Sequence, residues 1–159
     1  MSTESNFWKL MRKNLPEKWH ATRIENRTGG GIPDVHIACQ EGSFWVELKV
    51  TKNNSVKLTP HQIAWNTAYS HAGGVSFILV KHLGSGIIYL FEGRMVRGIS
   101  SDGLGFRDPL WSGRSGSDAW IAIRDAVASG SGLDSGFGAP FSAGRGKSGE
   151  KGKIENTIN

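Results

Sequence analysis

Two short apolar segments that follow each other closely constrain the fold more than any other feature of the sequence. Residues 33–39 and 44–50 each have the length and composition of a β-strand, and the polar triplet Glu-Gly-Ser at 41–43 separates them. This order predicts a β-hairpin. Charged residues nevertheless interrupt both segments, and a buried strand normally excludes charges because their desolvation is costly. They therefore need a metal ion, a partner or a substrate.

The charges in question are Asp34, Glu47 and Lys49. Residues two apart along a strand point to the same face, so Glu47 and Lys49 should project together, with Asp34 on the neighbouring strand. Two carboxylates beside an ammonium group form an oxygen-rich site that suits Mg²⁺, which completes its coordination with water and substrate phosphate. Such a site predicts phosphodiester hydrolysis, in which Lys49 positions the attacking water or neutralises the transition state. The alternative is a surface hairpin with a weak Glu47–Lys49 ion pair.

The rest of the pattern predicts one α/β domain over residues 1–128. Five strands are expected, at residues 21–27, 33–39, 44–50, 75–80 and 87–92. Three helices are expected to begin at the caps Ser5, Thr59 and Ser117, and Thr59 and Gln62 have the spacing of a capping box. Residues 129–159 are rich in Gly and Ser with scattered charges, which predicts a flexible basic tail.

Composition narrows the class of protein. The chain has 159 residues and a formal net charge of +5, which favours polyanionic partners only slightly. No apolar run is long enough to span a membrane, and the N-terminus lacks the apolar core of a signal peptide. Cys39 is the single cysteine, so an intramolecular disulfide and a cysteine-rich zinc site are excluded. We expect a cytoplasmic protein.

Pro33-Asp34 followed by Glu47-Leu48-Lys49 resembles the motif of the PD-(D/E)xK nuclease superfamily. The wider frame, residues 24–80, looks like the VRR-NUC and Holliday junction resolvase-like branches, which are often found in phages. The resemblance implies a restriction-endonuclease-like mixed β-sheet of about five strands flanked by helices. It also implies metal ligation by Asp34, Glu47 and the Leu48 carbonyl, a catalytic Lys49, Mg²⁺ with Mn²⁺ as a substitute, and a 5′-phosphate product.

Two further site residues carry alternatives. Members of the superfamily often have an additional N-terminal acid; we assign this role to Glu25, with Glu4 and Glu17 as alternatives. Gln62 either closes the capping box on Thr59 or contacts the attacking water or scissile phosphate, and the two roles are compatible. His36 and His61 are expected to be exposed or peripheral, and no Ser-His-Asp or Cys-His constellation stands out.

DNA contacts are expected around the acidic residues. Four basic residues flank them and should bind phosphates without reading sequence: Arg23, Arg27, Lys52 and Lys57. Gly30 and Gly31 either admit a DNA phosphate or form a plain tight turn, and the pattern of a nucleotide-binding loop is missing. The six tryptophans are candidates for core or interface positions; one could stack on an unpaired base, but the sequence does not select which.

The most specific expectation is a Holliday junction resolvase acting in DNA recombination. A small body without a separate sequence-reading module suits recognition of branched DNA, in particular four-way junctions, by shape. Symmetric cleavage of a junction requires two active sites, which predicts a homodimer. The alternatives are a flap or nicking nuclease of the same superfamily and a non-catalytic DNA-binding domain.

Overall fold

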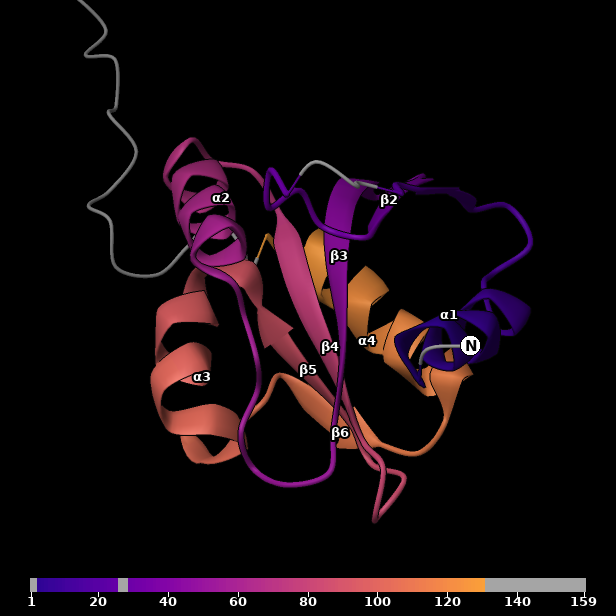
Figure 1. The fold of residues 1–159 in the computed structure, drawn as a ribbon. Coiled ribbons are helices and arrows are strands. Elements are labelled where there is room, and N and C mark those ends of the chain that lie inside the picture. The colour runs from indigo at the N-terminus through magenta and orange to yellow at the C-terminus, as the bar shows by residue number, and fades with distance from the viewer. Residues whose placement is uncertain (1–2, 26–28, 131–159) are drawn as a thin grey trace, which may run out of the picture.

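The computed structural model describes residues 3–25 and 29–130 and has a central mixed β-sheet (Figure 1). The six strands are neighbours in sequence order; β3 and β4 pair in parallel and all other neighbours are antiparallel. They are β1 (His20–Arg23), β2 (Val35–Cys39), β3 (Gly42–Thr51), β4 (Ser76–His82), β5 (Ile88–Glu92) and β6 (Trp111–Gly113). The predicted hairpin is therefore present as β2 and β3.

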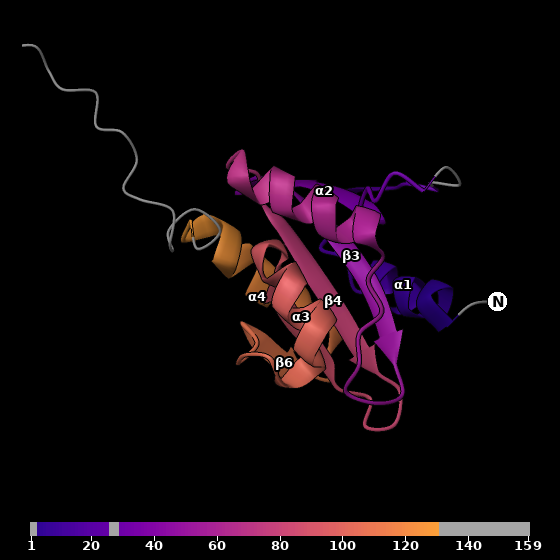
Figure 2. The same ribbon diagram turned by 60° about the vertical axis from the view of Figure 1, so that its left-hand side comes forward.

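Helices cover both faces of the sheet. Those in the described ranges are α1 (Thr3–Lys13), α2 (Pro60–His71), α3 (Val96–Asp102) and α4 (Gly116–Ala128), with short 3₁₀ turns η1 (Gly93–Met95) and η2 (Gly103–Gly105). Figures 1 and 2 show α1 and α4 on one side of the sheet and α2 and α3 on the other. The parallel pairing of β3 and β4 is possible because α2 carries the chain back between them.

Each face of the sheet has its own hydrophobic core. The larger core packs α1 and α4 against alternate residues of β2 to β5, such as Ile37, Phe44 and Leu79. A hydrogen bond of 2.8 Å from the Trp120 indole to the Met11 carbonyl joins the two helices. The smaller core lies under α2 and α3 and includes Ile78, Val80 and Phe91. Alternation along the strands thus builds two separate apolar layers.

The predicted α/β class, with a mixed sheet flanked by helices, is confirmed. Two predicted helix starts are wrong: α1 begins at Thr3 and includes Ser5, and Ser115, whose side chain accepts from the Asp118 N–H, caps α4 in place of Ser117. The sheet has six strands, and a Gly-rich stretch expected to be a connection contains α3 and β6.

Some predictions fall on residues that the structure leaves out. Arg27 lies outside the described residues, and so does the predicted tail from residue 131 onward. In the described part of the chain, every helix is too short or too polar to cross a bilayer.

Candidate active site

Asp34 lies just before β2, at the edge of the hairpin. The last pair of the β2–β3 register is Val35 opposite Val46, which puts Asp34 beside Glu47 across the two strands. Its Oδ2 accepts a hydrogen bond of 2.8 Å from the Leu48 N–H. The N–H and C=O of one strand residue point to the same side, so the Leu48 carbonyl faces the side of Asp34. The structure therefore brings together Asp34 and the backbone of Leu48.

Glu47 and Lys49 project from β3 on the side of α2, as the alternation predicts. Glu47 is 1% exposed and Lys49 is 9% exposed, and the Lys49 Nζ lies 3.4 Å from the Glu47 Oε1. The same Oε1 accepts a 2.8 Å hydrogen bond from the Gln62 side chain. The other oxygen, Oε2, is buried and has no hydrogen-bond partner among the described residues. One half of this carboxylate is therefore satisfied and the other half is available.

Gln62 closes the capping box as predicted and also contacts Glu47, whereas its predicted contact with the attacking water or scissile phosphate stays a prediction. Its Oε1 accepts from the Thr59 N–H at 3.0 Å while the Thr59 Oγ1 accepts from the Gln62 N–H at 3.1 Å, which completes the predicted capping box of α2. Since the Oε1 is held by the cap, the amide nitrogen points away from it, toward Glu47. The helix start thus orients a donor at the site.

The first turns of α2 are fixed against the rest of the domain. Gly31 has φ +71° and a Cβ there would lie 2.1 Å from the His61 carbonyl oxygen, so only glycine allows this close approach. The buried Asn66 donates to the Gln62 carbonyl at 2.9 Å and accepts from the Ser76 hydroxyl at 2.9 Å. These contacts give Gly31 a packing role against α2, whereas Gly30 is exposed, and its predicted DNA contact stays a prediction.

Burial raises the pKa values of the Asp34 and Glu47 carboxyl groups at the site. Burial, and next the charge of Asp34, raises the pKa of Glu47 to about 8, against the opposing effect of Lys49. Burial also raises the pKa of Asp34, while the Leu48 N–H, Lys49 and Arg23 act to lower it. Both carboxyl groups therefore hold their protons more tightly than usual, a property that gathers at functional sites.

The N-terminal acid that the structure places in this electrostatic environment is Glu4. It is half-buried in the first turn of α1; burial and the charge of Asp34 raise its pKa, and Lys49 acts to lower it. In turn, the charge of Glu4 contributes to the raised pKa of Glu47. Glu25 is exposed beyond the end of β1 and is not among the groups that shift these carboxyls, so the structure favours the alternative Glu4. We call Glu4, Asp34 and Glu47 the acidic cluster.

The chemistry of the donor set fits a hard divalent cation. In residues 3–25 and 29–130, no three side chains of His, Cys, Asp or Glu form a complete metal cage by themselves. Mg²⁺ does not require one, because it binds through one or two carboxylates and takes its remaining oxygens from water and phosphate. The buried, unpartnered Oε2 of Glu47 beside Asp34 provides the kind of acceptor that such an ion needs.

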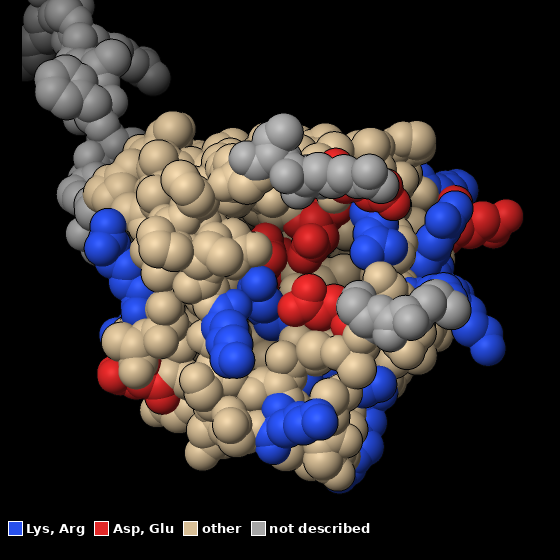
Figure 3. All heavy atoms as spheres, in the orientation of Figure 1, with Lys and Arg blue, Asp and Glu red and all other residues tan. Residues whose placement is uncertain are grey.

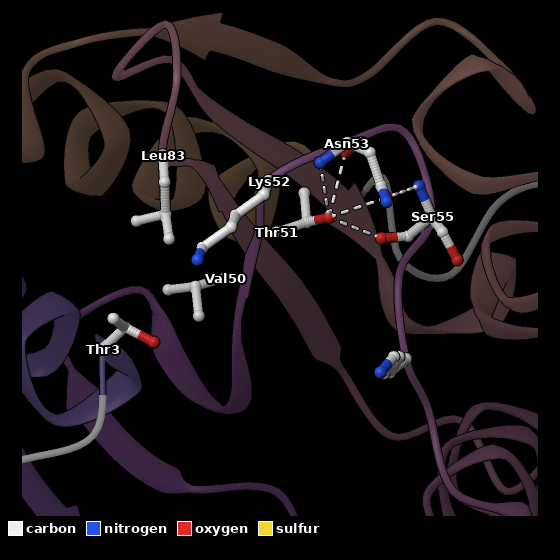
Figure 4. Close-up of a pocket in the computed structure, with 8 residues that line it drawn as sticks. Thr3, Val50, Thr51, Lys52, Asn53, Ser55 and Leu83 are labelled. Atoms are coloured by element: carbon white, nitrogen blue, oxygen red, sulfur yellow. Dashed lines mark hydrogen bonds between the residues drawn. The ribbon is translucent and has the colours of Figure 1, made fainter.

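Basic groups border the acidic cluster. Figure 3 shows acidic side chains in a hollow near the centre of one face, with lysine and arginine side chains at its edges. A pocket of about 480 Å³ lies beyond Lys49 at the end of β3, and its polar lining includes Lys52 and Lys57 (Figure 4). The Thr51 hydroxyl donates to the Ser55 carbonyl at 2.7 Å and thereby holds the loop that carries Lys52. Exposed lysines on a pocket of this size suit a DNA phosphate.

The remaining candidate residues lie at the edge of the site. Arg23 is exposed on β1, and its charge reaches Asp34. His61 is exposed in the first turn of α2, and the His36 ring packs on Trp45 with centroids 4.8 Å apart. Neither histidine joins a metal-binding group in the described part of the chain.

The similarity of this chain to known proteins is limited to solved structures. Neither a protein-family model nor a curated protein matches the sequence. Among solved structures, a Holliday junction resolvase of the archaeal hyperthermophile Archaeoglobus fulgidus is similar, with a TM-score of 0.47 and 16% sequence identity. The match covers 59% of this chain and 75% of that one. The function of this chain must therefore be argued from its own side chains.

Proposed function

We propose that this chain is a Mg²⁺-dependent endonuclease of the PD-(D/E)xK superfamily, with a restriction-endonuclease-like fold, and that it hydrolyses DNA phosphodiester bonds. One observation carries the proposal: the Glu47 Oε2 is buried without a partner in the described residues, beside Asp34 and Lys49. A buried carboxylate oxygen without a partner is costly, and a cation shared with Asp34 removes that cost.

The residues divide the work of hydrolysis. Asp34 and Glu47 would hold a divalent cation, which when bound would supply positive charge at the phosphate and lower the pKa of a water molecule. The Leu48 N–H holds the Asp34 carboxylate in place, and the Gln62 amide does the same for Glu47. Lys49, nearly buried beside Glu47, would stabilise the negative charge that develops on the phosphate.

The substrate we propose is branched DNA, with four-way junctions first, cleaved by a homodimer. The described residues form a single α/β body without an additional sequence-reading unit, which suits recognition of shape. Lys52 and Lys57 at the pocket, and Arg23 near Asp34, offer phosphate contacts on two sides of the acidic cluster. Mn²⁺ is expected to replace Mg²⁺.

The test is a digestion series with a four-way junction, a flap, single-stranded DNA and linear duplex of matched sequence. We expect Mg²⁺-dependent cleavage of the junction, loss of cleavage in Asp34→Asn and Glu47→Gln, and binding close to that of the wild type in both variants. Glu41→Gln is the matched control, because Glu41 is an exposed acid in the same hairpin.

Other results of the digestion series would contradict parts of the proposal. Wild-type rates in Asp34→Asn or Glu47→Gln would exclude the proposed active site. Equal cleavage of linear duplex and junction would exclude junction selectivity, and preferential cleavage of the flap would indicate a flap nuclease. DNA binding without any Mg²⁺-dependent cleavage would show a non-catalytic DNA-binding domain.

A further inference from the structure

Four ring side chains form a continuous row beside the acidic cluster. They are His36 on β2, Trp45 on β3, and Trp65 and Tyr69 on α2. Consecutive ring centroids are 4.8, 5.6 and 4.6 Å apart, and the last pair is stacked with an interplanar angle of 24°. All four are only partly buried. We call these residues the aromatic row.

The aromatic row starts next to the acidic cluster on each strand of the hairpin. His36 is two residues after Asp34, and Trp45 is two residues before Glu47. Residues two apart share a face and are separated by about 6.6 Å along a strand. On both strands, therefore, the next side chain on the active-site face is a ring.

The same relation holds on α2. Trp65 follows Gln62 by three residues, and residues three apart are neighbours on a helix surface. Tyr69 continues the series one turn further along α2. Three separate elements thus place a ring directly beside a residue of the candidate active site.

The surface around the aromatic row is open and suits a polyanion. On this face of the sheet, His20 and Thr22 of β1 are exposed, and Thr22 pairs with His36. The α2 sequence contains no acidic residue, and neither does β1. By contrast, the rings of the opposite face, such as Phe44 and Phe77, are buried under α1 and α4.

We infer that the aromatic row stacks on unpaired bases of the DNA strand next to the scissile phosphate. Aromatic side chains bind single-stranded DNA in this way because every base offers a flat face, whatever the sequence. The substrate class is then DNA with at least one unstacked or unpaired nucleotide beside the cut, as at a branch point or a flap. The inference rests on the proposed function for the position of the scissile phosphate.

The experiment compares two DNA probes that differ only in their bases. Both are duplexes with a single-stranded extension, one of thymidines and one of abasic nucleotides, and binding is measured by fluorescence anisotropy in EDTA. We expect the wild type to bind the thymidine probe about tenfold more tightly, the range of one stacked base. Trp45→Leu should abolish this preference, whereas Trp45→Phe should keep most of it.

The matched control is Trp111→Leu. Trp111 is also partly buried but packs against the core under α1 and α4, so the preference for thymidine should persist. If circular dichroism shows that Trp45→Leu does not fold, then His36→Leu and His36→Tyr provide the same comparison at the other strand.

Three outcomes would overturn the inference. They are equal affinity of the wild type for both probes, equal losses in the Leu and Phe variants, and dissociation of a dimer by Trp45→Leu in sedimentation, which would make the row an interface between copies. The proposed nuclease function fails separately: it requires Mg²⁺-dependent cleavage, which the binding assay in EDTA does not involve. A base preference without any cleavage would support stacking and refute the nuclease.

Discussion

The two faces of β3 have different roles, although their residues alternate along one strand. On one face Phe44, Val46 and Leu48 are at most 2% exposed and pack under α1 and α4. On the other face Glu47 and Lys49, 1% and 9% exposed, are also buried but carry charge. Burial of the first face stabilises the fold, whereas burial of the charged groups on the second face lowers stability. Since side chains alternate strictly, substitutions on the two faces should have separable effects.

The largest effect is expected for Phe44→Ala on the apolar face. Phe44 is fully buried and makes edge-to-face contacts with Trp19 and Phe77, with centroids 5.9 and 5.6 Å apart. Removing the ring leaves a cavity, and the free energy of unfolding should fall by about 3–5 kcal/mol. Urea denaturation measures this loss, and the exposed neighbour Ser43→Ala should change stability by less than about 0.5 kcal/mol. A loss below about 1 kcal/mol for Phe44→Ala would contradict the packing.

The next effect concerns the charged face, where the titration of Glu47 makes the stability of the protein depend on pH. The pKa of Glu47 is about 8 in the folded protein and 4.5 as its ordinary value. Between these values the native carboxyl keeps a proton that the unfolded chain has released, so the metal-free protein should lose stability as pH rises through this window. The loss is on the order of a few kcal/mol by pH 8, and thermal denaturation in EDTA from pH 5 to 8 measures it.

Glu47→Gln removes the titrating group and should flatten this pH profile, so that the variant is more stable than the wild type at pH 8. Mn²⁺ should raise the melting temperature of the wild type more at pH 8 than at pH 5, because protons compete with the cation, and should not do so for the variant. A profile of the variant that is parallel to that of the wild type would show that Glu47 does not cause the pH dependence.

Lys49→Ala should lower the cleavage rate by about 100-fold if its ammonium stabilises charge on the phosphate. The control is Lys81→Ala: Lys81 lies on the adjacent strand β4, opposite Val50 in the parallel register and therefore on the apolar side. Its removal should leave the rate within about threefold of the wild type, as for a charge away from the site. Single-turnover rates with saturating enzyme separate chemistry from binding, and equal losses in both variants would make the role of Lys49 unspecific.

Local patterns predicted the charged face well. The two apolar segments of the hairpin, the period of two along residues 44–50 and the Thr59–Gln62 capping box are short-range features, and each is present in the structure. The second contact of Gln62, with Glu47, follows from how α2 packs on β3, which no sequence spacing determines. The capping box fixed the direction of the amide, but only the fold shows its target.

The sequence ranks Glu4 only as an alternative to Glu25, and the reason is local. A cap at Ser5 leaves Glu4 outside the predicted first helix, whereas α1 starts at Thr3 and Glu4 lies one turn before the buried Phe7 and Trp8. Residues three and four apart share a helix face, so an earlier start would have placed Glu4 on the side that packs against the sheet. The short strand β6 and helix α3 were missed because Gly-rich segments of this length lack a clear period.

The smallest effects are expected at Gln62, whose side-chain oxygen accepts from Thr59 and whose side-chain nitrogen donates to Glu47. Substitutions can test these two hydrogen bonds separately. Thr59→Ala removes the hydroxyl of the cap and should cost about 1 kcal/mol of stability, with cleavage nearly unchanged. Gln62→Glu keeps an acceptor that suits the third position of a capping box but replaces the donor to Glu47 with a carboxylate. Repulsion should raise the pKa of Glu47 further, so cleavage should fall several-fold at pH 7 and recover at higher pH. Parallel melting curves and pH–rate profiles measure both effects; a wild-type pH–rate profile in Gln62→Glu would show that the contact with Glu47 has no part in the chemistry.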